Sequence, residues 1–355
     1  MRSCSRTASI TFSREGDLSS YVERQIGIVG NRPIVYSPIQ RAADILRKGG
    51  MVAFPTETVY GLGARAFDKE AVARIFAIKG RPEDNPLIVH IAQKDQLHLL
   101  SPKIPALADR LIEAFWPGPL TLVLERANDL PAIVSAGLST VAVRMPNHKV
   151  ALSLIRAVGE PIAAPSANRS GHISPTSAHH VRKEFGNDLA MILDGGPCTI
   201  GLESTVLDLT ADPPRILRPG TITQEAIASV IGTVASYSKM KKASGSPGLK
   251  QSHYAPQLTM ILVPSNQWQA VLSQSLLSGK RIGTLSMQNK EISPLYSKVM
   301  THLADYAHNL FASLHEAEEA GVDILLVESV PHEGLGIAIM DRLERGAGFS
   351  RSGVD

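Results

Sequence analysis

Two short motifs place hydroxyl groups and glycines directly after predicted strands. PTETVYGLG spans 55–63 and APSANRSG spans 164–171, and each follows a short apolar run. Small hydroxyl and amide side chains beside glycines, at the carboxyl end of a strand, suit a loop that binds phosphate or ribose. Both motifs are also compatible with a plain strand-to-helix turn, in which Thr, Ser and Gly serve only the backbone. They indicate a ligand site if charged groups gather at the same place.

Cationic side chains do recur near strand ends. In KGRP at 79–82, Lys79 and Arg81 flank a glycine and could hold a polyphosphate, with Arg81 as a planar fork and Lys79 as a point charge. Lys79 also suits plain capping of a helix C-terminus. Arg144 lies in the apolar strand VAVRMP at 141–146, where a charge is costly unless it is paired. We favour the carboxylate of a ligand as its partner, and a solvent-facing position is the alternative.

Three further polar residues leave two interpretations open. His90 ends the run NPLIVH at 85–90, and a lone histidine among apolar residues is more often a core residue than a catalytic one. Asp194 could contact Mg²⁺, but the Asp-Gly pair that it begins is more typical of a turn. Arg218 closes another strand. Together, cations, hydroxyls and glycines at several strand ends predict a site for a phosphate-rich ligand, with Arg144 available for a carboxylate.

A basic segment without acidic residues runs from 233 to 256. It holds four lysines and the pair His253 and Tyr254. Composition alone predicts a flexible linker. Because a pure tether needs no His-Tyr pair, the segment could also fold over an anionic ligand as a lid. The alternative is a docked linker whose Tyr254 packs on a domain surface.

Missing signatures narrow the chemistry. The sequence has no P-loop motif, no HExxH and no CxxC, and the Gly-Leu-Gly at 61–63 lacks the third glycine of a dinucleotide fingerprint. Cys4 and Cys198 are the only cysteines, too few for a disulfide framework or a four-thiolate zinc site. Any nucleotide site must therefore be built in another way.

Length and composition predict a two-domain α/β protein. The chain has 355 residues, and domains of about 150 residues are typical. A net charge of +3 does not force binding to nucleic acid, and no apolar run approaches the length of about 20 residues that spans a bilayer. We expect a cytoplasmic protein without a membrane partner. The Arg- and Ser-rich start leaves an organellar transit peptide as the alternative to a disordered extension.

Hydrophobic periodicity locates the elements that must carry the motifs. Helical spacing is found at 38–48, 70–78, 106–115, 150–158, 224–231, 268–277, 304–320 and 337–345. Strand-like runs lie at 51–54, 87–91, 120–125, 141–145, 162–164, 191–193, 204–209, 215–217, 258–263, 281–285 and 323–327. Because the strands outnumber the helices and lie close together, they predict a mixed α/β sheet and not a strictly alternating parallel one. We expect a flexible extension at 1–32, a first domain at 33–235, a basic linker or lid at 236–257 and a small Rossmann-like βαβ domain at 258–355.

The order of the motifs resembles that of a known enzyme family. PTETVYGLG at 55–63, KGRP at 79–82, NPLIVH at 85–90, WPGPLT at 116–121, VAVRMP at 141–146, APSANxSG at 164–171 and EST at 203–205 are together similar to the motifs of the YrdC/TsaC threonylcarbamoyl-AMP synthases. SPGLKQSHYAP at 246–256 and the domain after it resemble the long form of that family. The resemblance covers about 33–348. One departure is Asp341, where the family commonly has Asn.

The resemblance implies a fold and a reaction. The catalytic domain at 33–235 would be a twisted, YrdC-like mixed sheet with a concave basic face. The enzyme would be a nucleotidyltransferase that joins L-threonine, bicarbonate or CO₂, and ATP into L-threonylcarbamoyl-AMP and releases pyrophosphate. A separate tRNA threonylcarbamoyl transferase complex would pass the group to N6 of adenosine 37 in tRNAs that read ANN codons. Mg²⁺ would arrive with ATP, and we expect no tightly bound metal site in the protein.

The resemblance also assigns roles to the matched residues. The threonine pocket would comprise Thr58, His90, Arg144, Ala164 and Ser204. The ATP contacts would come from Arg81, Asn85, Thr140, Ser166, Ser174, Arg218, His253 and Tyr254, the last two closing over the nucleotide. Lys79 and Arg81 would act on the phosphate charge as catalytic residues. Such an enzyme works by positioning and charge stabilisation, which agrees with the lack of an obvious nucleophile.

Two other functions remain as alternatives. An RNA-binding module could use the same basic face, and weak RNA binding would then show a steep dependence on salt. A carbamoyltransferase of the hydrogenase-maturation type contains a related domain, but it needs zinc fingers that two cysteines cannot build.

Overall fold

The computed structural model describes residues 26–29, 32–35, 37–235, 237, 254–287 and 294–347. By its contacts the chain divides into two units, Met1–Pro38 and Ile39–Asp355. The first unit contains an antiparallel pair of strands, β1 (Ile26–Val29) and β2 (Arg32–Val35). The predicted extension lies outside the described residues apart from these strands, and the basic linker does so apart from Tyr237 and the stretch from Tyr254 onward. The predictions for His253 and the four lysines therefore fall outside the described part of the chain.

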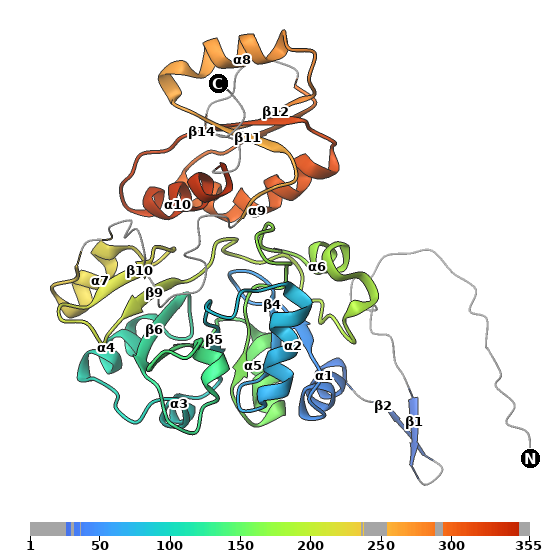
Figure 1. Cartoon of the computed structure of the whole chain (residues 1–355), viewed down its shortest axis with the longest axis vertical. Coiled ribbons are helices and arrows are strands. Elements are labelled where there is room, and N and C mark those ends of the chain that lie inside the picture. Colours follow the sequence, from blue (N-terminus) through green and yellow to red (C-terminus); the bar gives the residue numbers. More distant parts are fainter. Residues whose placement is uncertain are drawn as a thin grey trace, which may run out of the picture. The chain divides into compact units, whose positions relative to one another are not determined.

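An eight-stranded mixed sheet forms the centre of the catalytic part of the second unit (Figure 1). In spatial order its strands are β10 (Arg215–Arg218), β9 (Thr205–Asp208), β6 (Leu120–Glu125), β7 (Thr140–Arg144), β5 (Ile88–His90), β8 (Ile162–Ala163), β4 (Gly61–Arg65) and β3 (Val52–Phe54). β5 pairs with β7 and β6 pairs with β9 in parallel, and the remaining neighbours are antiparallel. The prediction of a mixed sheet is confirmed.

Two parts of this sheet differ from the sequence prediction. β4 is a strand where a ligand loop was expected to continue to residue 63. Its sequence GLGAR has two glycines and no β-branched residue, so it lacks the pattern that marks a strand. The run at 191–193, expected as a strand, makes only an isolated bridge from Ile192 to Ala53. Both differences lie beside β3, on the side of the sheet that carries the PTETVYGLG motif.

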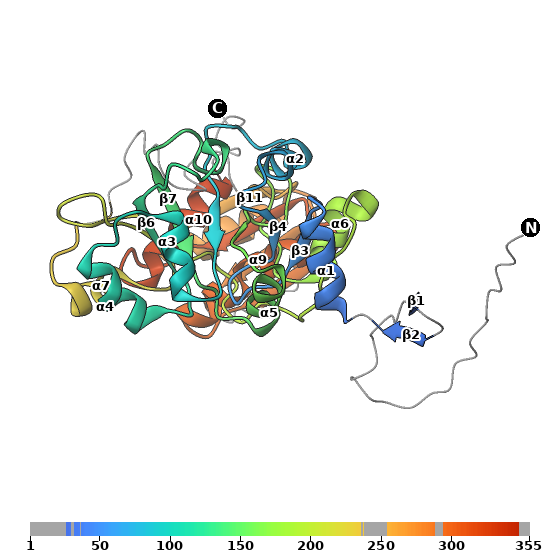
Figure 2. The same ribbon diagram turned by 90° about the horizontal axis from the view of Figure 1, so that it is seen from below.

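Helices pack on both faces of the sheet. α1 (Pro38–Arg47) and α5 (Lys149–Val158) share a core with β3 and β8, and Figure 2 shows these two helices next to each other. α2 (Lys69–Lys79), α3 (Leu97–Leu100), α4 (Ala106–Phe115) and α7 (Gln224–Ile231) bury their apolar sides against β5, β6 and β7. α6 (Ala178–Phe185), which was not predicted, packs with β4 and α2. Short 3₁₀ turns lie at Lys94–Gln96, Ala132–Ser135, Gly186–Asp188 and Ser265–Gln267.

Strand alternation places polar groups on the same face as α1 and α5, beside the part that these helices cover. Val89 and Val143 belong to the core under α2, α3, α4 and α7, so their neighbours in sequence point the other way. That other face carries a small buried cluster of five aliphatic residues, Ile88, Val123, Ala142, Val206 and Leu217. His90 and Arg144 follow Ile88 and Ala142 by two positions and therefore share this face.

A four-stranded parallel sheet forms the C-terminal part of the chain. Its order is β11 (Thr259–Val263), β14 (Ile324–Glu328), β12 (Ile282–Ser286) and β13 (Tyr296–Val299). α8 (Trp268–Leu276) covers one face, and α9 (Leu303–Glu319) and α10 (Leu335–Ala347) cover the other. The predicted βαβ arrangement is confirmed, although β13 was not predicted.

α9 and α10 lie between the small sheet and the catalytic part (Figure 1). Their core includes Val59, Ile173, Leu202 and Tyr254 together with residues of both helices. The two parts are thus joined by a shared apolar cluster next to the PTETVYGLG motif. No helix in the described ranges is both long enough and apolar enough to cross a membrane.

Candidate active site

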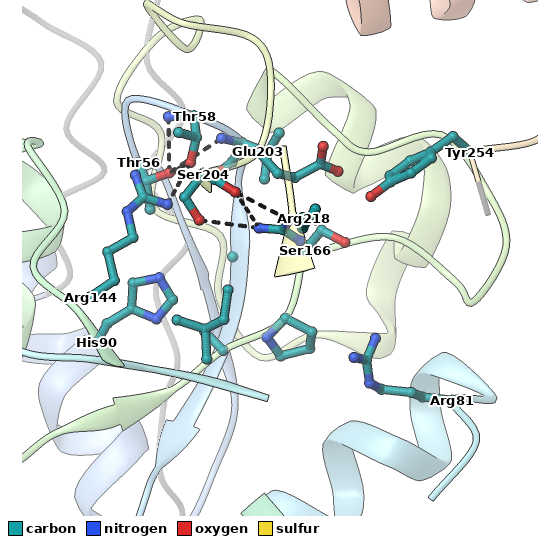
Figure 3. A pocket seen from close by; sticks show the side chains of 15 residues that line it. Thr56, Thr58, Arg81, His90, Arg144, Ser166, Glu203, Ser204, Arg218 and Tyr254 are labelled. Carbon is teal, nitrogen blue, oxygen red and sulfur yellow. Dashed lines mark hydrogen bonds between the residues drawn. The ribbon is translucent and has the colours of Figure 1, made fainter. Parts of the chain in front are cut away.

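The sheet register brings His90 and Arg144 side by side. β5 and β7 run parallel, and their pairing sets His90 directly opposite Arg144. Both side chains are buried, with residue exposures of 5% and 3%. Figure 3 shows them entering the pocket from the same side, with Arg81 approaching from another. A register set by apolar neighbours on both strands therefore fixes the spacing of two polar groups.

One pocket collects most of the predicted site residues. Its wall consists of Thr56, Thr58, Val59, Gly61, Arg81, Ile88, His90, Arg144, Ala164, Pro165, Ser166, Glu203, Ser204, Arg218 and Tyr254. The cavity volume is small, about 50 Å³.

Arg144 is held by three groups. Its Nε donates to the carbonyl of Gly118 at 3.1 Å, and its Nη1 donates to Thr58 Oγ1 at 2.8 Å. Its Nη2 lies 2.6 Å from Glu57 Oε1, an ion pair in which both side chains are 4% exposed. A buried guanidinium needs such a counter-charge, because burial without one is costly. Arg144 is thus fixed and neutralised by Glu57, which sequence reasoning did not assign to the site.

The loop after β3 is shaped by its own threonines. Thr56 Oγ1 accepts from the backbone N–H groups of Thr58 and Val59, each at 3.2 Å, and donates to the Val59 carbonyl at 2.6 Å. The two hydroxyls of Thr56 and Thr58 are 2.9 Å apart. These local bonds explain why hydroxyl residues are found here and present Thr58 to Arg144. The turn interpretation of this motif fits these bonds, and the ligand interpretation stays a prediction for Thr58, which lines the pocket.

His90 is a neutral imidazole in the pocket wall. Burial, followed by the positive charge of Arg144, lowers the pKa of His90 to about 3. Its Nδ1 is buried and has no hydrogen-bond partner among the residues that the structure describes. The ring packs edge-on against Phe54, with the ring centres 6.0 Å apart. His90 can therefore accept a hydrogen bond from a ligand, but it is too weak a base to take a proton from an amine.

Two more guanidinium groups face the pocket. Arg81 donates to Asn85 Oδ1 at 2.7 Å and to the Pro86 carbonyl at 2.8 Å. Arg218 donates to Ser204 through Nη2, to the carbonyl at 2.9 Å and to the hydroxyl at 3.1 Å. Burial lowers the pKa of both arginines, that of Arg81 to about 9. A lowered pKa marks a cation that lacks full compensation, so the pocket favours an anion.

Glu203 is the one carboxylate in the described pocket wall. Its Oε1 accepts from Ser174 Oγ at 2.6 Å, and its Oε2 accepts from Arg342 Nε at 3.0 Å. Gly220 lets the loop that follows Arg218 approach this segment, since a Cβ there would lie 2.4 Å from the backbone nitrogen of Thr205. Both carboxylate oxygens of Glu203 thus accept hydrogen bonds from the protein itself.

Lys79 is not among the described residues that line the pocket. Its ammonium donates to the carbonyls of Ser166 and Asn168, and the residue is 3% exposed. Burial, and then the neighbouring charge of Arg81, lowers the pKa of Lys79 well below its usual range. Its observed contacts hold the APSANRSG loop against the end of α2. The predicted catalytic role of Lys79 stays a prediction.

Tyr254 covers the pocket from the side of the C-terminal part. It is 1% exposed, stacks on Phe311 with ring centres 5.4 Å apart and adopts a φ of 67°. Burial, followed by the charge of Glu203, raises the pKa of Tyr254 to about 12. A positive φ is unusual for a tyrosine and marks a backbone held by its surroundings.

The predicted site residues fall into three groups. Nine of them line the pocket: Thr58, Arg81, His90, Arg144, Ala164, Ser166, Ser204, Arg218 and Tyr254. Lys79, Asn85 and Ser174 lie one contact behind it, and Thr140 sits at the start of β7 opposite Glu125. His253 lies outside the described residues. The structure adds Thr56, Glu57 and Glu203, whose motifs had been noted but whose side chains had been given no role.

A metal site is not formed by the described side chains. No group of three His, Cys, Asp or Glu residues lies close enough together within these ranges to hold an ion. Asp194 instead pairs with Arg182 at 3.1 Å on the surface and accepts the backbone N–H of Gly196. The turn interpretation of Asp194 fits this geometry.

The fold and the pocket define a class before any comparison. Three buried guanidinium groups, a neutral histidine and several hydroxyls converge at the polar face of a mixed sheet, and a second α/β domain closes one side. Such a site binds a small molecule with several negative charges and positions it without a protein nucleophile.

Known proteins similar to this chain are threonylcarbamoyl-AMP synthases. The family model for Sua5, YciO and YrdC, which carries the description "Telomere recombination", matches residues 44–220, and the model for the threonylcarbamoyl-AMP synthase C-terminal domain matches residues 222–348. The threonylcarbamoyl-AMP synthase of Pyrococcus abyssi is 46% identical over 321 residues, which cover 88% of this chain and 94% of that protein. The Bacillus subtilis synthase is also 46% identical, over 87% of this chain and 93% of that protein. The crystal structure of P. abyssi Sua5 complexed with L-threonine matches with a TM-score of 0.83 at 44% identity, covering 88% of this chain and 94% of that one.

The chain therefore belongs to the threonylcarbamoyl-AMP synthases, in the long form that has a Sua5 C-terminal domain. The resemblance seen in the motifs, the YrdC-like catalytic sheet and the nucleotidyltransferase class are confirmed.

Proposed function

We propose that the pocket joins L-threonine, CO₂ or bicarbonate, and ATP into L-threonylcarbamoyl-AMP with release of pyrophosphate. The observation that carries the proposal is Arg144, a buried guanidinium that faces a pocket shared with two further arginines. One guanidinium suits the carboxylate of an amino acid, and the other two suit a polyphosphate. The division of the chain at 33–235, 236–257 and 258–355 is part of the same proposal.

Threonine occupies the part of the pocket around Arg144. The guanidinium binds the substrate carboxylate as a fork, and Thr58 keeps that fork in place. Ala164 and Ser204 complete this end, and the apolar Ile88 beside them accepts the substrate methyl group. A contact of that kind separates threonine from serine by only about 1–3 kcal/mol.

ATP occupies the part around Arg81 and Arg218. Ser166 lines this part, while Asn85 and Ser174 act through Arg81 and Glu203. Thr140 and His253 are included as ATP contacts on the basis of the motif resemblance. Lys79 sets the position of the loop that carries Ser166, and we assign its effect on the phosphates to that loop.

We expect Mg²⁺ to arrive with ATP, bound mainly by phosphate oxygens, and to neutralise the charge of the leaving pyrophosphate. The described residues offer no protein cage for the ion. The steps of the reaction are therefore argued from the side chains of the chain itself.

The reaction needs positioning more than acid-base chemistry. The free amine of threonine attacks CO₂, and the proton that it loses passes to bulk water or buffer, which leaves a carbamate anion. A carbamate oxygen then attacks the α-phosphorus of ATP, and the bond to pyrophosphate breaks. His90 accepts a hydrogen bond from the substrate without taking its proton, because its pKa is lowered to about 3. Arg81 and Arg218 stabilise the charge that develops on the phosphates.

Tyr254 forms part of the pocket wall and stacks on Phe311 of the C-terminal domain. We propose that His253 and Tyr254 withdraw to admit ATP and then close over it. The product passes to a separate tRNA threonylcarbamoyl transferase complex, and any RNA binding by the chain itself is weak.

The direct test is the product. Mass spectrometry of a reaction with ATP, threonine and bicarbonate should show threonylcarbamoyl-AMP, and pyrophosphate release should need both threonine and bicarbonate. Pyrophosphate release that is independent of threonine would refute the proposal. Tight, salt-sensitive RNA binding without a response to ATP or threonine would favour an RNA-binding role instead.

A further inference from the structure

Arg342 is a buried cation of the C-terminal part that reaches into the catalytic part. It lies on α10, and the residue is only 1% exposed. Its Nε donates to Glu203 Oε2 at 3.0 Å, and its Nη1 donates to the Pro219 carbonyl at 2.8 Å. Its guanidinium carbon lies 5.6 Å from the ring centre of Tyr254. The segments that carry Glu203, Pro219 and Tyr254 thus all contact the Arg342 side chain.

Each of these three residues either lines the pocket or directly follows a residue that does. Glu203 lines the pocket and accepts from Ser174, a proposed ATP contact. Pro219 directly follows Arg218, which faces the pocket. A shift of the Arg342 guanidinium would therefore move Glu203 and the backbone next to Arg218 together, since Glu203 and the Pro219 carbonyl both accept hydrogen bonds from it.

The charge of Arg342 is secured within its own helix. Asp341 Oδ2 accepts from Arg342 Nη1 at 3.0 Å, and Asp341 also pairs with Arg345 at 2.9 Å and accepts from the Tyr237 hydroxyl at 2.7 Å. Burial alone would lower the pKa of Arg342, but Tyr254, Glu203 and Asp341 together hold it above its ordinary range. These contacts also show how an aspartate serves at a position where asparagine was expected. Asp341 and Glu203 each accept a hydrogen bond from the Arg342 guanidinium, and together they fix its orientation.

We propose that Arg342 is a positioning residue for the ATP part of the site, through which the C-terminal domain holds Glu203 and the backbone beside Arg218 in register. The residue is not catalytic, because it is not among the described residues that line the pocket. Its planar fork is required, since a lysine ammonium cannot serve Glu203, Asp341 and the Pro219 carbonyl in the same plane. The inference rests on the proposed function, from which it takes the identity of the nucleotide.

The test compares three variants, Arg342→Met, Arg342→Lys and the double variant Arg342→Met/Glu203→Gln. We expect Arg342→Met to raise the KM for ATP at least tenfold and to leave the KM for threonine within threefold. Arg342→Lys should behave in the same way. The double variant should recover thermal stability, because it leaves no unpaired buried carboxylate, and should keep the raised KM for ATP. Purely structural damage would instead reduce the active fraction and leave both KM values unchanged.

The matched control is Arg281→Met. Arg281 makes a close pair with Asp323 in the same domain, at 2.7 Å, on the surface. The Arg281→Met variant should keep the KM for ATP and the KM for threonine within twofold of those of the unmodified chain. The proposal is overturned if folded Arg342→Met keeps the ATP KM of the unmodified chain, if Arg342→Lys restores it, or if the double variant restores it.

A second measurement separates this proposal from the proposed function. Calorimetric titration with a non-hydrolysable ATP analogue needs no turnover. If the unmodified chain releases no pyrophosphate, the proposed function fails, yet tenfold weaker binding of the analogue by Arg342→Met would still support the positioning role. Equal binding by both proteins would overturn it.

Discussion

At the scale of single residues, the pocket works through groups that are bound before substrate arrives. Arg144 has a partner for each of its three nitrogens, in Gly118, Thr58 and Glu57. A guanidinium fixed in this way loses little freedom when a carboxylate binds, so its hydrogen bonds contribute more to affinity. Glu57 also keeps the free pocket from carrying an uncompensated buried charge.

The fork of Arg144 gives the first prediction. Arg144→Lys should raise the KM for threonine about 10- to 100-fold, because charge-assisted hydrogen bonds contribute about 1.5–3 kcal/mol and an ammonium cannot replace the fork. Steady-state pyrophosphate release at saturating ATP measures the change. Arg126→Lys is the control, since Arg126 donates to the carbonyls of Leu130 and Leu138 away from the pocket. Equal KM values in both variants would contradict the carboxylate role.

His90 gives a second prediction, about stability and pH. Its pKa is lowered to about 3 in the folded chain, whereas an unfolded histidine titrates near 6.5. The unfolded state therefore binds an extra proton between these values, so stability is complete above about pH 6.5 and is lost as the pH falls toward 3. In His90→Gln the slope of unfolding free energy against pH, between pH 6 and pH 4, should fall by up to about 1.4 kcal/mol per pH unit.

Urea unfolding at several pH values measures these slopes. The control is His98→Gln on α3, at an exposed position, which should leave the slope unchanged. An identical slope in His90→Gln and the unmodified chain would show that His90 is not held neutral by burial.

At the scale of elements, the site depends on how α2 ends. Gly80 adopts the left-handed conformation with φ 59° and caps the helix, which directs Lys79 toward the loop at 166–168. Arg81 then leaves the helix in the direction of Asn85 and the pocket. One helix C-terminus thus supplies a support for a loop and a cation for the ligand.

The support gives a third prediction. Lys79→Met keeps the length of the side chain but removes the donors to the Ser166 and Asn168 carbonyls. The loop should shift, and a displacement of about 1 Å can cost about 100-fold in rate, so we expect kcat/KM to fall by that order. Circular dichroism should show an unchanged helix content. Lys69→Met, at the exposed start of the same helix, should retain activity, and a similar loss there would assign the effect to α2 itself.

The elements also show how far the sequence alone could go. Amphipathic helices such as α1 and α5 follow from the spacing of their apolar residues, and Arg144 stands out because it interrupts an apolar strand. β4 was missed because glycines conceal a strand that is defined by its neighbours β3 and β8. Glu57 and Glu203 were missed because their partners, Arg144 and Arg342, lie far away in the sequence and meet them only in the folded chain.

At the scale of the whole molecule, the small net charge of the chain does not reveal that positive charge is concentrated in the pocket wall. The chain carries +3 overall, yet three guanidinium groups share one pocket wall with a single carboxylate among the residues that the structure describes. The C-terminal domain supplies Arg342 to that carboxylate, so both domains contribute to one electrostatic arrangement. The apolar cluster that includes Leu202 and Tyr254 joins them over the same segments. Docking of the domains and shape of the pocket are therefore coupled.

Gly201 lies where the segment before Leu202 packs directly on the backbone of α9. Its φ is +74°, and a Cβ there would lie 1.9 Å from the carbonyl oxygen of His308 on α9. The neighbouring Thr199 carbonyl lies 3.0 Å from His308 Nδ1, and the Ile200 N–H donates to the Glu57 carbonyl at 2.7 Å. The segment thus links α9 to the residue that pairs with Arg144. No flexible side chain can yield here, because the obstacle is backbone.

Gly201→Ala should therefore separate the domains locally and disturb the pocket as well. We expect faster proteolysis of the linker and at least a tenfold loss of kcat/KM, with the catalytic sheet still folded. Gly159→Ala is the matched control, because Gly159 has a φ of +87° with nothing within 4 Å of an added Cβ, so it carries the same backbone strain without the collision. If both variants lose stability and activity equally, left-handed strain explains the effect. If only Gly201→Ala loses activity, close contact of α9 is needed for a working site, and the C-terminal domain is part of the active enzyme and not an appendage.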